Sequence, residues 1–293
     1  MCYDIKASLE AQKSRAVRSG NLNAVQEIER LLQHHTKLPQ THLNGFNHPV
    51  LGLYTNESNG SLSLGRWGLV PHWFAGAPET LKFNTLNARS ESMFDKAAFA
   101  QAAEQYRGIL MIDGFYEHQH RSSGIYPYFI YRKDHEPMAV ACIYEPMPYD
   151  DDLGSTQLGA LNTKKPPLSL SFSIVTIAAN TLMSGIHNNP KLKQARMPLI
   201  LTPEMEDLWL LPEIHKSEAF TTSTSHILPH KGLNEKFVRQ CQEIELDCHT
   251  VAPLRTKSGK IGQGNGSMPT NDASLPFEYP ELGQEWDLFS GLN

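Results

Sequence analysis

The centre of the predicted fold is the stretch Ile109-Leu110-Met111-Ile112-Asp113-Gly114-Phe115-Tyr116-Glu117. Its apolar side chains predict a β-strand over residues 109–116 in a protein core. Glu117 follows at the end of this strand, where a carboxyl group next to a core can act as a general acid. The plainer interpretation is a solvated glutamate at a strand end. The stretch therefore predicts a core strand and a candidate acid.

Further strands are expected on both sides of this stretch. The segments combine β-branched and aromatic residues and are separated by turn-forming residues such as those of 56–60. Together with helices placed around them, they indicate an α+β fold, a single domain with a curved, barrel-like and mainly antiparallel sheet and peripheral helices. The predicted strands are Val50–Thr55, Ser61–Trp67, Tyr126–Tyr131, Met138–Ile143 and Phe172–Ile177.

Three segments have helical patterns. Residues 6–36 carry apolar residues at three-to-four spacing, and Ser19-Gly20-Asn21 predicts a break into two helices. Residues 94–106 are Ala-rich with the same spacing. Thr202-Pro203-Glu204 predicts a helix start that runs through Trp209, because Thr suits the N-cap and Pro the first turn.

Composition limits the class of protein. The chain has 293 residues, 40% of them apolar and 19% charged, with a net charge of −5. A core can therefore form, and any contact with nucleic acid must come from a local basic cluster. No apolar run is long enough for a membrane span or a secretory signal, so we expect a cytoplasmic protein that does not bind membranes. We predict a catalytic domain over residues 1–254 and a flexible tail over 255–293, rich in Gly, Ser and Asn.

The four cysteines are Cys2, Cys142, Cys241 and Cys248. No pair has the C-x-x-C spacing, so we expect unpaired thiols, no metal and no cofactor. The alternative is a zinc site that uses Cys241, Cys248 and the following His249.

Cys2 has chemistry that no internal residue offers once Met1 is removed. It then carries an α-amine and a thiol on neighbouring carbons, so an aldehyde can form a Schiff base with the amine and then a thiazolidine ring with the thiol. An α-amine titrates near 7.7–8.0 and a lysine near 10.4, so far more of the α-amine is free at neutral pH. A cysteine at position 2 can also be incidental.

Other segments carry candidate contacts. Trp67-Gly68-Leu69-Val70-Pro71-His72-Trp73 is either core packing or a surface on which bases stack. Asn87-Ala88-Arg89-Ser90-Glu91 places an amide and a guanidinium two residues apart, on one face if the segment is extended. His187 lies in a loop, and Arg196-Met197-Pro198 leads into an apolar run.

These segments together resemble the SRAP family, the SOS response-associated peptidase-like abasic-site processing proteins. The resemblance covers residues 1–211 and implies capture of abasic sites in single-stranded DNA as a covalent crosslink, with self-removal of Met1 and AP-lyase chemistry. It implies that Cys2 is the nucleophile, Asn87 orients it, Glu117 transfers protons and His187 polarises the sugar oxygen. It assigns Arg89 and Arg196 to phosphate contacts, and Trp67 and Trp73 are expected to contact DNA. We expect a monomer.

The sequence departs from the family pattern at three places. Many members read C-G-R at the start and G-F-Y-E-W after the central strand, whereas this chain has Tyr3, Asp4 and His118. In the family the histidine and arginine often lie in H-x-R-M-P, but residues 188–195 separate them here. Residues 188–195 are therefore interpreted as an insertion relative to the family pattern.

Two other functions fit parts of the sequence. An N-terminal-nucleophile amidohydrolase would also use Cys2, but it leaves the tryptophans and arginines unexplained. A single-stranded DNA-binding protein would use the aromatic and arginine residues alone, and would not need Cys2.

The tail suggests one partner besides DNA. Gln284-Glu285-Trp286-Asp287-Leu288-Phe289 resembles the short peptides that dock on the replication sliding clamp, which use apolar anchors and a glutamine. In the alternative, Trp286, Leu288 and Phe289 fold back onto the domain.

Overall fold

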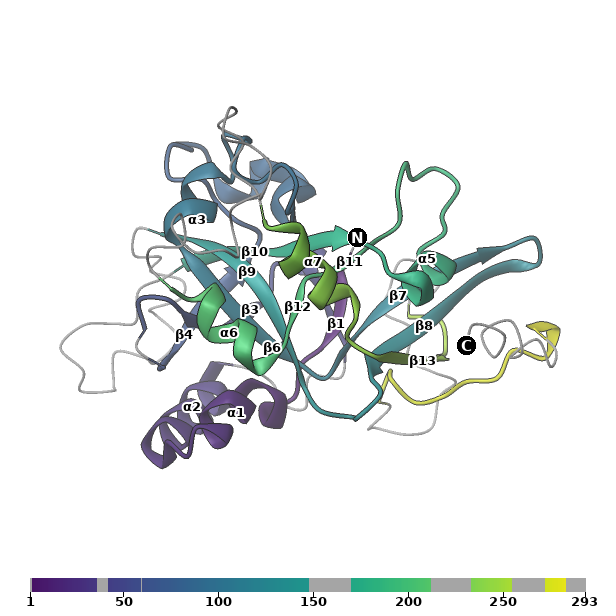
Figure 1. Cartoon of the computed structure of the whole chain (residues 1–293), viewed down its shortest axis with the longest axis horizontal. Coiled ribbons are helices and arrows are strands. Elements are labelled where there is room, and N and C mark those ends of the chain that lie inside the picture. The colour runs from purple at the N-terminus through teal and green to yellow at the C-terminus, as the bar shows by residue number, and fades with distance from the viewer. Residues whose placement is uncertain are drawn as a thin grey trace.

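The computed structural model describes residues 2–35, 42–58, 60–147, 170–211, 233–254 and 272–282, which form two β-sheets with helices around them (Figure 1). The strands are β1 (Asp4–Lys6), β2 (Leu43–Asn44), β3 (Val50–Thr55), β4 (Leu62–Trp67), β5 (Asn87–Arg89), β6 (Arg107–Ile112), β7 (Gly114–Arg121), β8 (Gly124–Arg132), β9 (Met138–Pro146), β10 (Leu170–Ala178), β11 (Arg196–Pro198), β12 (Ile200–Leu201) and β13 (Leu246–Thr250). The helices are α1 (Leu9–Arg18), α2 (Leu22–His35), α3 (Ala100–Gln105), α5 (Thr181–Ile186), α6 (Pro203–Trp209) and α7 (Glu235–Gln242), with short 3₁₀ turns η1 (Gly45–Asn47), η2 (Pro78–Thr85) and η5 (Pro280–Leu282).

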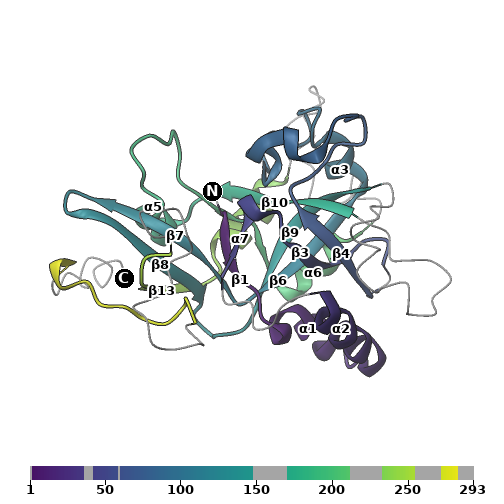
Figure 2. The same ribbon diagram turned by 180° about the vertical axis from the view of Figure 1, so that it is seen from behind.

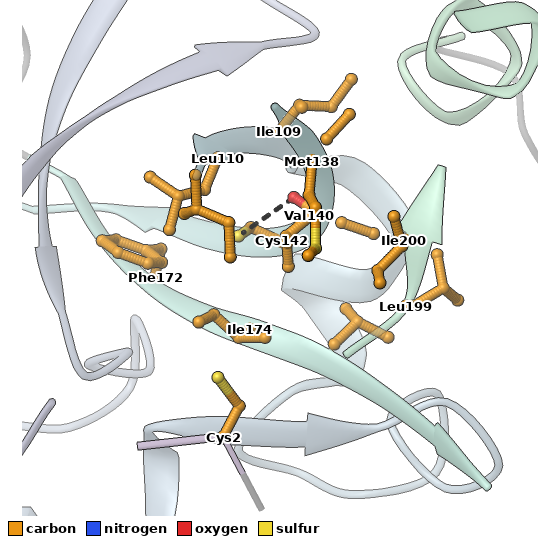
Figure 3. Close-up of a cluster of buried hydrophobic side chains, with 14 of the residues drawn as sticks. Cys2, Ile109, Leu110, Met138, Val140, Cys142, Phe172, Ile174, Leu199 and Ile200 are labelled. Atoms are coloured by element: carbon orange, nitrogen blue, oxygen red, sulfur yellow. Dashed lines mark hydrogen bonds between the residues drawn. The ribbon is translucent and has the colours of Figure 1, made fainter. Parts of the chain in front are cut away.

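The larger sheet closes into a barrel. Strands β10, β4, β3, β6 and β9 pair in that order, and β9 also pairs with β10. All of the pairs in the ring are antiparallel except β10 with β4. Apolar side chains such as Val140, Phe172 and Ile174 cluster where these strands meet (Figure 3). The expected α+β fold with a curved, mainly antiparallel sheet is confirmed.

The second sheet is open and has the order β13-β8-β7-β1-β2. It lies beside the barrel, and the N-terminus lies between the two in both views (Figures 1 and 2). Strand β1 pairs antiparallel with β7, with Asp4 opposite Tyr116 and Ile5 opposite Phe115. The first residues of the chain are thus held against the strand that contains Glu117.

The prediction of a single strand over residues 109–116 is wrong. Residues 109–116 are not one strand, because Asp113 separates β6 of the barrel from β7 of the open sheet. The Asp113 carboxylate accepts hydrogen bonds from the Ser8 backbone N–H, at 2.6 Å, and from the Ser8 hydroxyl, at 2.8 Å. Gly114 begins β7 where a Cβ atom would lie 2.5 Å from the backbone oxygen of Ile130. Any larger residue would push the two strands apart at this point.

The observed helices agree in part with those predicted from the sequence. The break at residues 19–21 is confirmed, and Gly20 adopts a φ of +69°, which favours glycine. The helix after Thr202 is confirmed over Pro203–Trp209. Over residues 94–106, only Ala100–Gln105 is helical, because the preceding residues form turns instead. The pattern also missed β1, since Asp4–Lys6 pairs with distant strands rather than starting a helix.

Part of the predicted tail packs on the open sheet. The Lys6 ammonium donates to the carboxylate of Asp272 at 2.6 Å, and the Tyr279 hydroxyl donates to the backbone oxygen of Val251 at 2.9 Å. The boundary proposed at residue 254 remains a prediction. The clamp-like segment 284–289 lies outside the described residues.

Among the residues that the structure describes, no helix combines the length and the apolar character that crossing a membrane requires.

Candidate functional site

Cys2 lies at the seam between the two sheets. Its side chain is 3% exposed and points toward Ile174 of β10, at the edge of the apolar cluster (Figure 3). The Asn87 side-chain amide, at the start of β5, donates a hydrogen bond of 2.9 Å to the Cys2 backbone oxygen. The Asn87 side-chain oxygen is buried and has no hydrogen-bond partner in the described structure. Asn87 therefore holds the Cys2 backbone and keeps one acceptor available at the seam.

Glu117 and His187 face each other at the same seam. Glu117 Oε2 lies 3.8 Å from His187 Nε2, and both side chains are largely buried. Glu117 is the fourth residue of β7, so the prediction that it ends a strand is corrected: the strand continues to Arg121. His187 directly follows α5. Distances of this kind often shorten when a substrate binds, so the pair is well placed to exchange a proton.

The His187 ring is held by the backbone of Arg196. Nδ1 lies 2.9 Å from both the backbone nitrogen and the backbone oxygen of Arg196. Burial lowers the pKa of His187 below its usual value, and the opposing effect of the Glu117 charge does not reverse this. A neutral imidazole at neutral pH can therefore present Nε2 to Glu117 as either donor or acceptor, depending on its tautomer.

Burial also determines the protonation state of the Cys2 thiol. It raises the pKa of Cys2 well above the usual value, and the neighbouring Glu117 charge raises it further. The thiol therefore stays protonated at neutral pH in the chain that still carries Met1. A protonated thiol is a poor nucleophile without a base close by, and Glu117 is a nearby carboxylate.

Arg196 is placed differently from the expectation of a phosphate contact. It is 2% exposed, and its guanidinium makes two hydrogen bonds to the Glu91 carboxylate, the longer at 2.7 Å. It also donates to the backbone oxygen of Thr176 at 2.6 Å. Burial alone would raise the pKa of Glu91, but the hydrogen bonds and charge of Arg196, together with a backbone hydrogen bond and the Ser90 hydroxyl, outweigh it and the pKa is lowered. In this structure Arg196 joins β11 to the Asn87–Glu91 segment, and its charge is neutralised.

Of the two tryptophans in the motif at residues 67–73, Trp67 is buried and Trp73 is exposed. Trp67 is fully buried, and its indole N–H donates to the backbone oxygen of Leu86 at 2.9 Å. It therefore offers no ring face to a base in this structure, which corrects the expectation for this residue. Trp73 is 54% exposed, and its role in DNA contact remains a prediction. Arg89 is exposed at the end of β5, where a phosphate could reach it.

A family model described as SOS response associated peptidase (SRAP) matches residues 1–241. This chain belongs to the SRAP family. The residues brought together at the seam all lie within the matched region.

Relatives of this SRAP protein come from animals and bacteria. It is 31% identical over 255 residues to the abasic site processing protein HMCES of Xenopus tropicalis, covering 78% of this chain and 71% of the relative. It is 30% identical to the abasic site processing protein YoqW of Bacillus subtilis (strain 168), covering 56% and 63%. Its fold is similar to a crystal structure of a protein from Bacteroides thetaiotaomicron, with a TM-score of 0.59, 25% identity and coverage of 86% and 92%.

The three substituted residues at two of the departures from the SRAP sequence pattern, Tyr3, Asp4 and His118, line one cavity of about 330 Å³, which Glu117 also borders. The Tyr3 ring packs on Phe46 at a centroid distance of 4.8 Å. Asp4 is buried and accepts hydrogen bonds from His42 and from the Asn44 amide. Asp4 therefore anchors β1 to the segment before β3, and it is not presented to a phosphate. Sequence reasoning missed Phe46 and His42, since neither belongs to a motif.

The described residues contain neither a disulfide nor a group of side chains that could bind a metal ion. All four cysteines are free. No three His, Cys, Asp or Glu side chains come close enough together there to hold a metal ion.

Proposed function

We propose that this SRAP protein senses abasic sites in single-stranded DNA and captures them covalently through Cys2, which shields the lesion. One observation carries the proposal: Cys2, Asn87, Glu117 and His187 come from four separate parts of the chain and meet at one seam. The names of the relatives support the class of lesion. An abasic site exposes an aldehyde when its sugar ring opens, and it has no base that must first be flipped out of the way.

The first step removes Met1 and frees the α-amine of Cys2. The opened deoxyribose then presents an aldehyde carbon, and the amine adds to it. Loss of one water molecule gives an imine. An α-amine suits this step because a substantial fraction is unprotonated at neutral pH.

The second step closes the ring. The Cys2 sulfur adds to the imine carbon, the thiol proton passes to a base, and the imine nitrogen takes up a proton. The product is a thiazolidine, with no net change in oxidation state. Addition of the thiol to the imine releases the thiol proton, so a nearby base must take it. Glu117 is the residue that we assign to this transfer.

The residues around Cys2 promote opening of the deoxyribose ring. Opening of the deoxyribose ring moves a proton from the C1 hydroxyl to the ring oxygen. Glu117 and His187, 3.8 Å apart, provide an acceptor and a donor for that transfer. Asn87 orients the Cys2 backbone through the 2.9 Å hydrogen bond.

Two further activities belong to the proposal. Self-removal of Met1 would be a peptidase reaction, in keeping with the family description. An imine at the abasic sugar also allows loss of a C2 proton and departure of the 3′ phosphate, which is the AP-lyase reaction.

The test is a crosslinking assay on a single-stranded oligonucleotide with one abasic site. The wild-type protein should form a heat-stable adduct, and mass spectrometry should show loss of Met1. Cys2→Ala should abolish the stable adduct, while a Schiff base trapped by borohydride can remain because the alanine amine still condenses. Cys241→Ala is a control, since this buried cysteine lies on α7.

The same assay separates the alternatives. A protein that only binds single-stranded DNA would keep its full activity in Cys2→Ala and form no adduct. An amidohydrolase would form an acyl-enzyme with a small amide and ignore the oligonucleotide. Stable adduct formation by protein that retains Met1 throughout would contradict the mechanism.

A further inference from the structure

Residues 188–195 form a loop whose two ends lie in the functional site. The loop leaves His187 and returns at Arg196, and the His187 ring closes its base by contacting the Arg196 backbone at 2.9 Å. Figures 1 and 2 show it projecting between α5 and β11, beside the N-terminus. Anything bound at the seam therefore lies next to this loop.

The loop is held in a defined conformation. The Asn188 side chain accepts a 2.7 Å hydrogen bond from the His120 backbone N–H and donates a 3.0 Å hydrogen bond to the His120 backbone oxygen. The Asn189 side chain accepts from the Lys191 backbone N–H at 3.0 Å, and the Ala195 backbone oxygen accepts from Ala179 at 3.1 Å. These bonds fix the loop on β7 at one end and on the end of β10 at the other.

The tip of the loop is positively charged and directed outward. Lys191 and Lys193 are exposed, and the segment 188–195 contains no acidic residue. Neither ammonium group contacts a carboxylate in the part of the chain that the structure describes. Even the apolar Leu192 between them is 37% exposed, so the tip does not fold back on the domain.

A third cation, Arg89, lies on the other side of the end of β10. Arg89 is on β5, which pairs with one edge of β10, while Arg196, at the base of the loop, is on β11, which pairs with the other edge. Arg89 and the loop lysines therefore lie on opposite sides of one strand end. The protein as a whole has a net charge of −5, so these cations form a local exception to its overall charge.

We propose that Lys191 and Lys193 bind backbone phosphates of the DNA strand on one side of the lesion. The inference rests on the proposed function, because it needs a single strand at the seam. A strand whose abasic sugar lies at Cys2 must pass Arg89 on one side and the loop on the other. Since Arg196 is neutralised by Glu91, the lysines supply the cations on the loop side.

The experiment measures binding of the full chain to an abasic single strand by fluorescence anisotropy over a range of salt concentrations. Each phosphate contact on a single strand contributes about 0.7 to the slope of log affinity against log salt. The double variant Lys191→Ala/Lys193→Ala should therefore lower the slope by about 1.4. Its crosslinking rate at saturating DNA should equal that of the wild type, because the lysines do not take part in the chemistry.

A matched control carries the same change of charge elsewhere. Lys13 pairs with Glu29 on the α1–α2 hairpin, and Lys133 is exposed in the turn after β8. Lys13→Ala/Lys133→Ala should leave the salt slope unchanged. Equal slopes in the loop variant and this control would overturn the inference.

Shortening the oligonucleotide gives a second readout. Removing nucleotides from one side of the abasic site should weaken wild-type binding more than removal from the other side, and the loop variant should not respond to that sensitive side. An equal response of the two proteins to both truncations would also overturn the inference. A wild-type protein that binds the strand but forms no adduct would instead refute the proposed function, so the two failures can be distinguished.

Discussion

The closed barrel and the open sheet contribute different kinds of residue to the site. Side chains from the barrel and its flanking strands, such as Asn87 and Arg196, are fixed by hydrogen bonds to backbone groups or to an ion-pair partner. The open sheet and the segment leading into it contribute Cys2 and Glu117, which are the groups that we propose to react. The two regions share one continuous stretch, β6 and β7, separated only by Asp113.

The barrel and the open sheet also differ in how deeply their residues are buried. Every residue of β6 is buried, whereas four of the five residues of β7 from Glu117 to Arg121 are partly exposed. A closed ring leaves no free strand edge within it, so it provides a rigid support. The open sheet has accessible edges and faces, one of which the segment 272–282 partly covers. The comparison suggests that the barrel determines stability and the open sheet determines chemistry, and three variants test this.

The largest effect is expected at Glu117. Glu117→Gln should slow crosslinking by roughly 10²–10⁴-fold, because the amide cannot transfer a proton. Binding to single-stranded DNA and the unfolding free energy should change little. The rate is measured by quenching the adduct reaction at successive times. Glu136→Gln, at an exposed position in the loop between β8 and β9, is the control and should react at the wild-type rate. A normal crosslinking rate in Glu117→Gln would mean that Glu117, on the open sheet, does not transfer the proton.

The next effect is expected in the barrel. The fully buried Arg107 guanidinium donates to the backbone oxygens of Trp209 at 3.0 Å, Ala103 at 3.1 Å and Glu104 at 2.7 Å. It thereby satisfies carbonyl groups at the ends of α3 and α6. Arg107→Met should lower the unfolding free energy by about 3 kcal/mol or more, because these acceptors stay buried without a donor. Urea unfolding measures the loss.

Arg30→Met provides the surface control for this variant. The Arg30 side chain is 42% exposed and, among the residues that the structure describes, pairs only with Glu27, so its replacement should change stability by about 0.5 kcal/mol or less. Folded Arg107→Met protein should keep its crosslinking rate at low temperature. A slow rate in fully folded protein would show that the barrel does more than support the site.

The smallest effect is expected on the outer face of the open sheet. Burial would raise the pKa of Asp272, but its hydrogen bonds to Lys6 and Ser274, together with the Lys6 charge, outweigh this and the pKa is lowered. Because the folded pKa lies below the unfolded value, the pair stabilises the fold above an unfolded pKa of about 3.9. That stabilisation is lost as the pH falls through the folded pKa.

Asp272→Asn should therefore cost about 0.5–1 kcal/mol at neutral pH and remove this acid-dependent loosening. Hydrogen exchange of residues 272–282 measures the effect, and Glu278→Gln, exposed in the same segment, is the control. Identical exchange of the wild type and Asp272→Asn at neutral pH would mean that other contacts hold the segment.

Local patterns predicted the elements that depend on neighbouring residues. The break between α1 and α2 follows from Gly20, and the start of α6 follows from Pro203, because each residue acts on its own backbone. The switch from β6 to β7 could not be predicted in this way. It depends on hydrogen bonds between Asp113 and Ser8, which are 105 positions apart.

The candidate site shows the same division. The motifs located Cys2, Asn87, Glu117 and His187, and the structure brings these four together. They did not indicate which tryptophan is internal, since Trp67 and Trp73 lie in the same motif. Nor did they indicate that Arg196 pairs with Glu91, because that ion pair joins residues 105 positions apart.

The sequence by itself determined the residue types that can react, the main helices and most of the barrel strands. An α-amine beside a thiol, or a glycine between two helices, acts through covalent and local properties that are present in any conformation. Only the tertiary structure decided the closure of the barrel, the place of β1 beside β7 and the burial of Trp67 and Arg196. Each of these depends on hydrogen bonds and packing between segments far apart in the chain, and such pairings arise only when the whole domain folds.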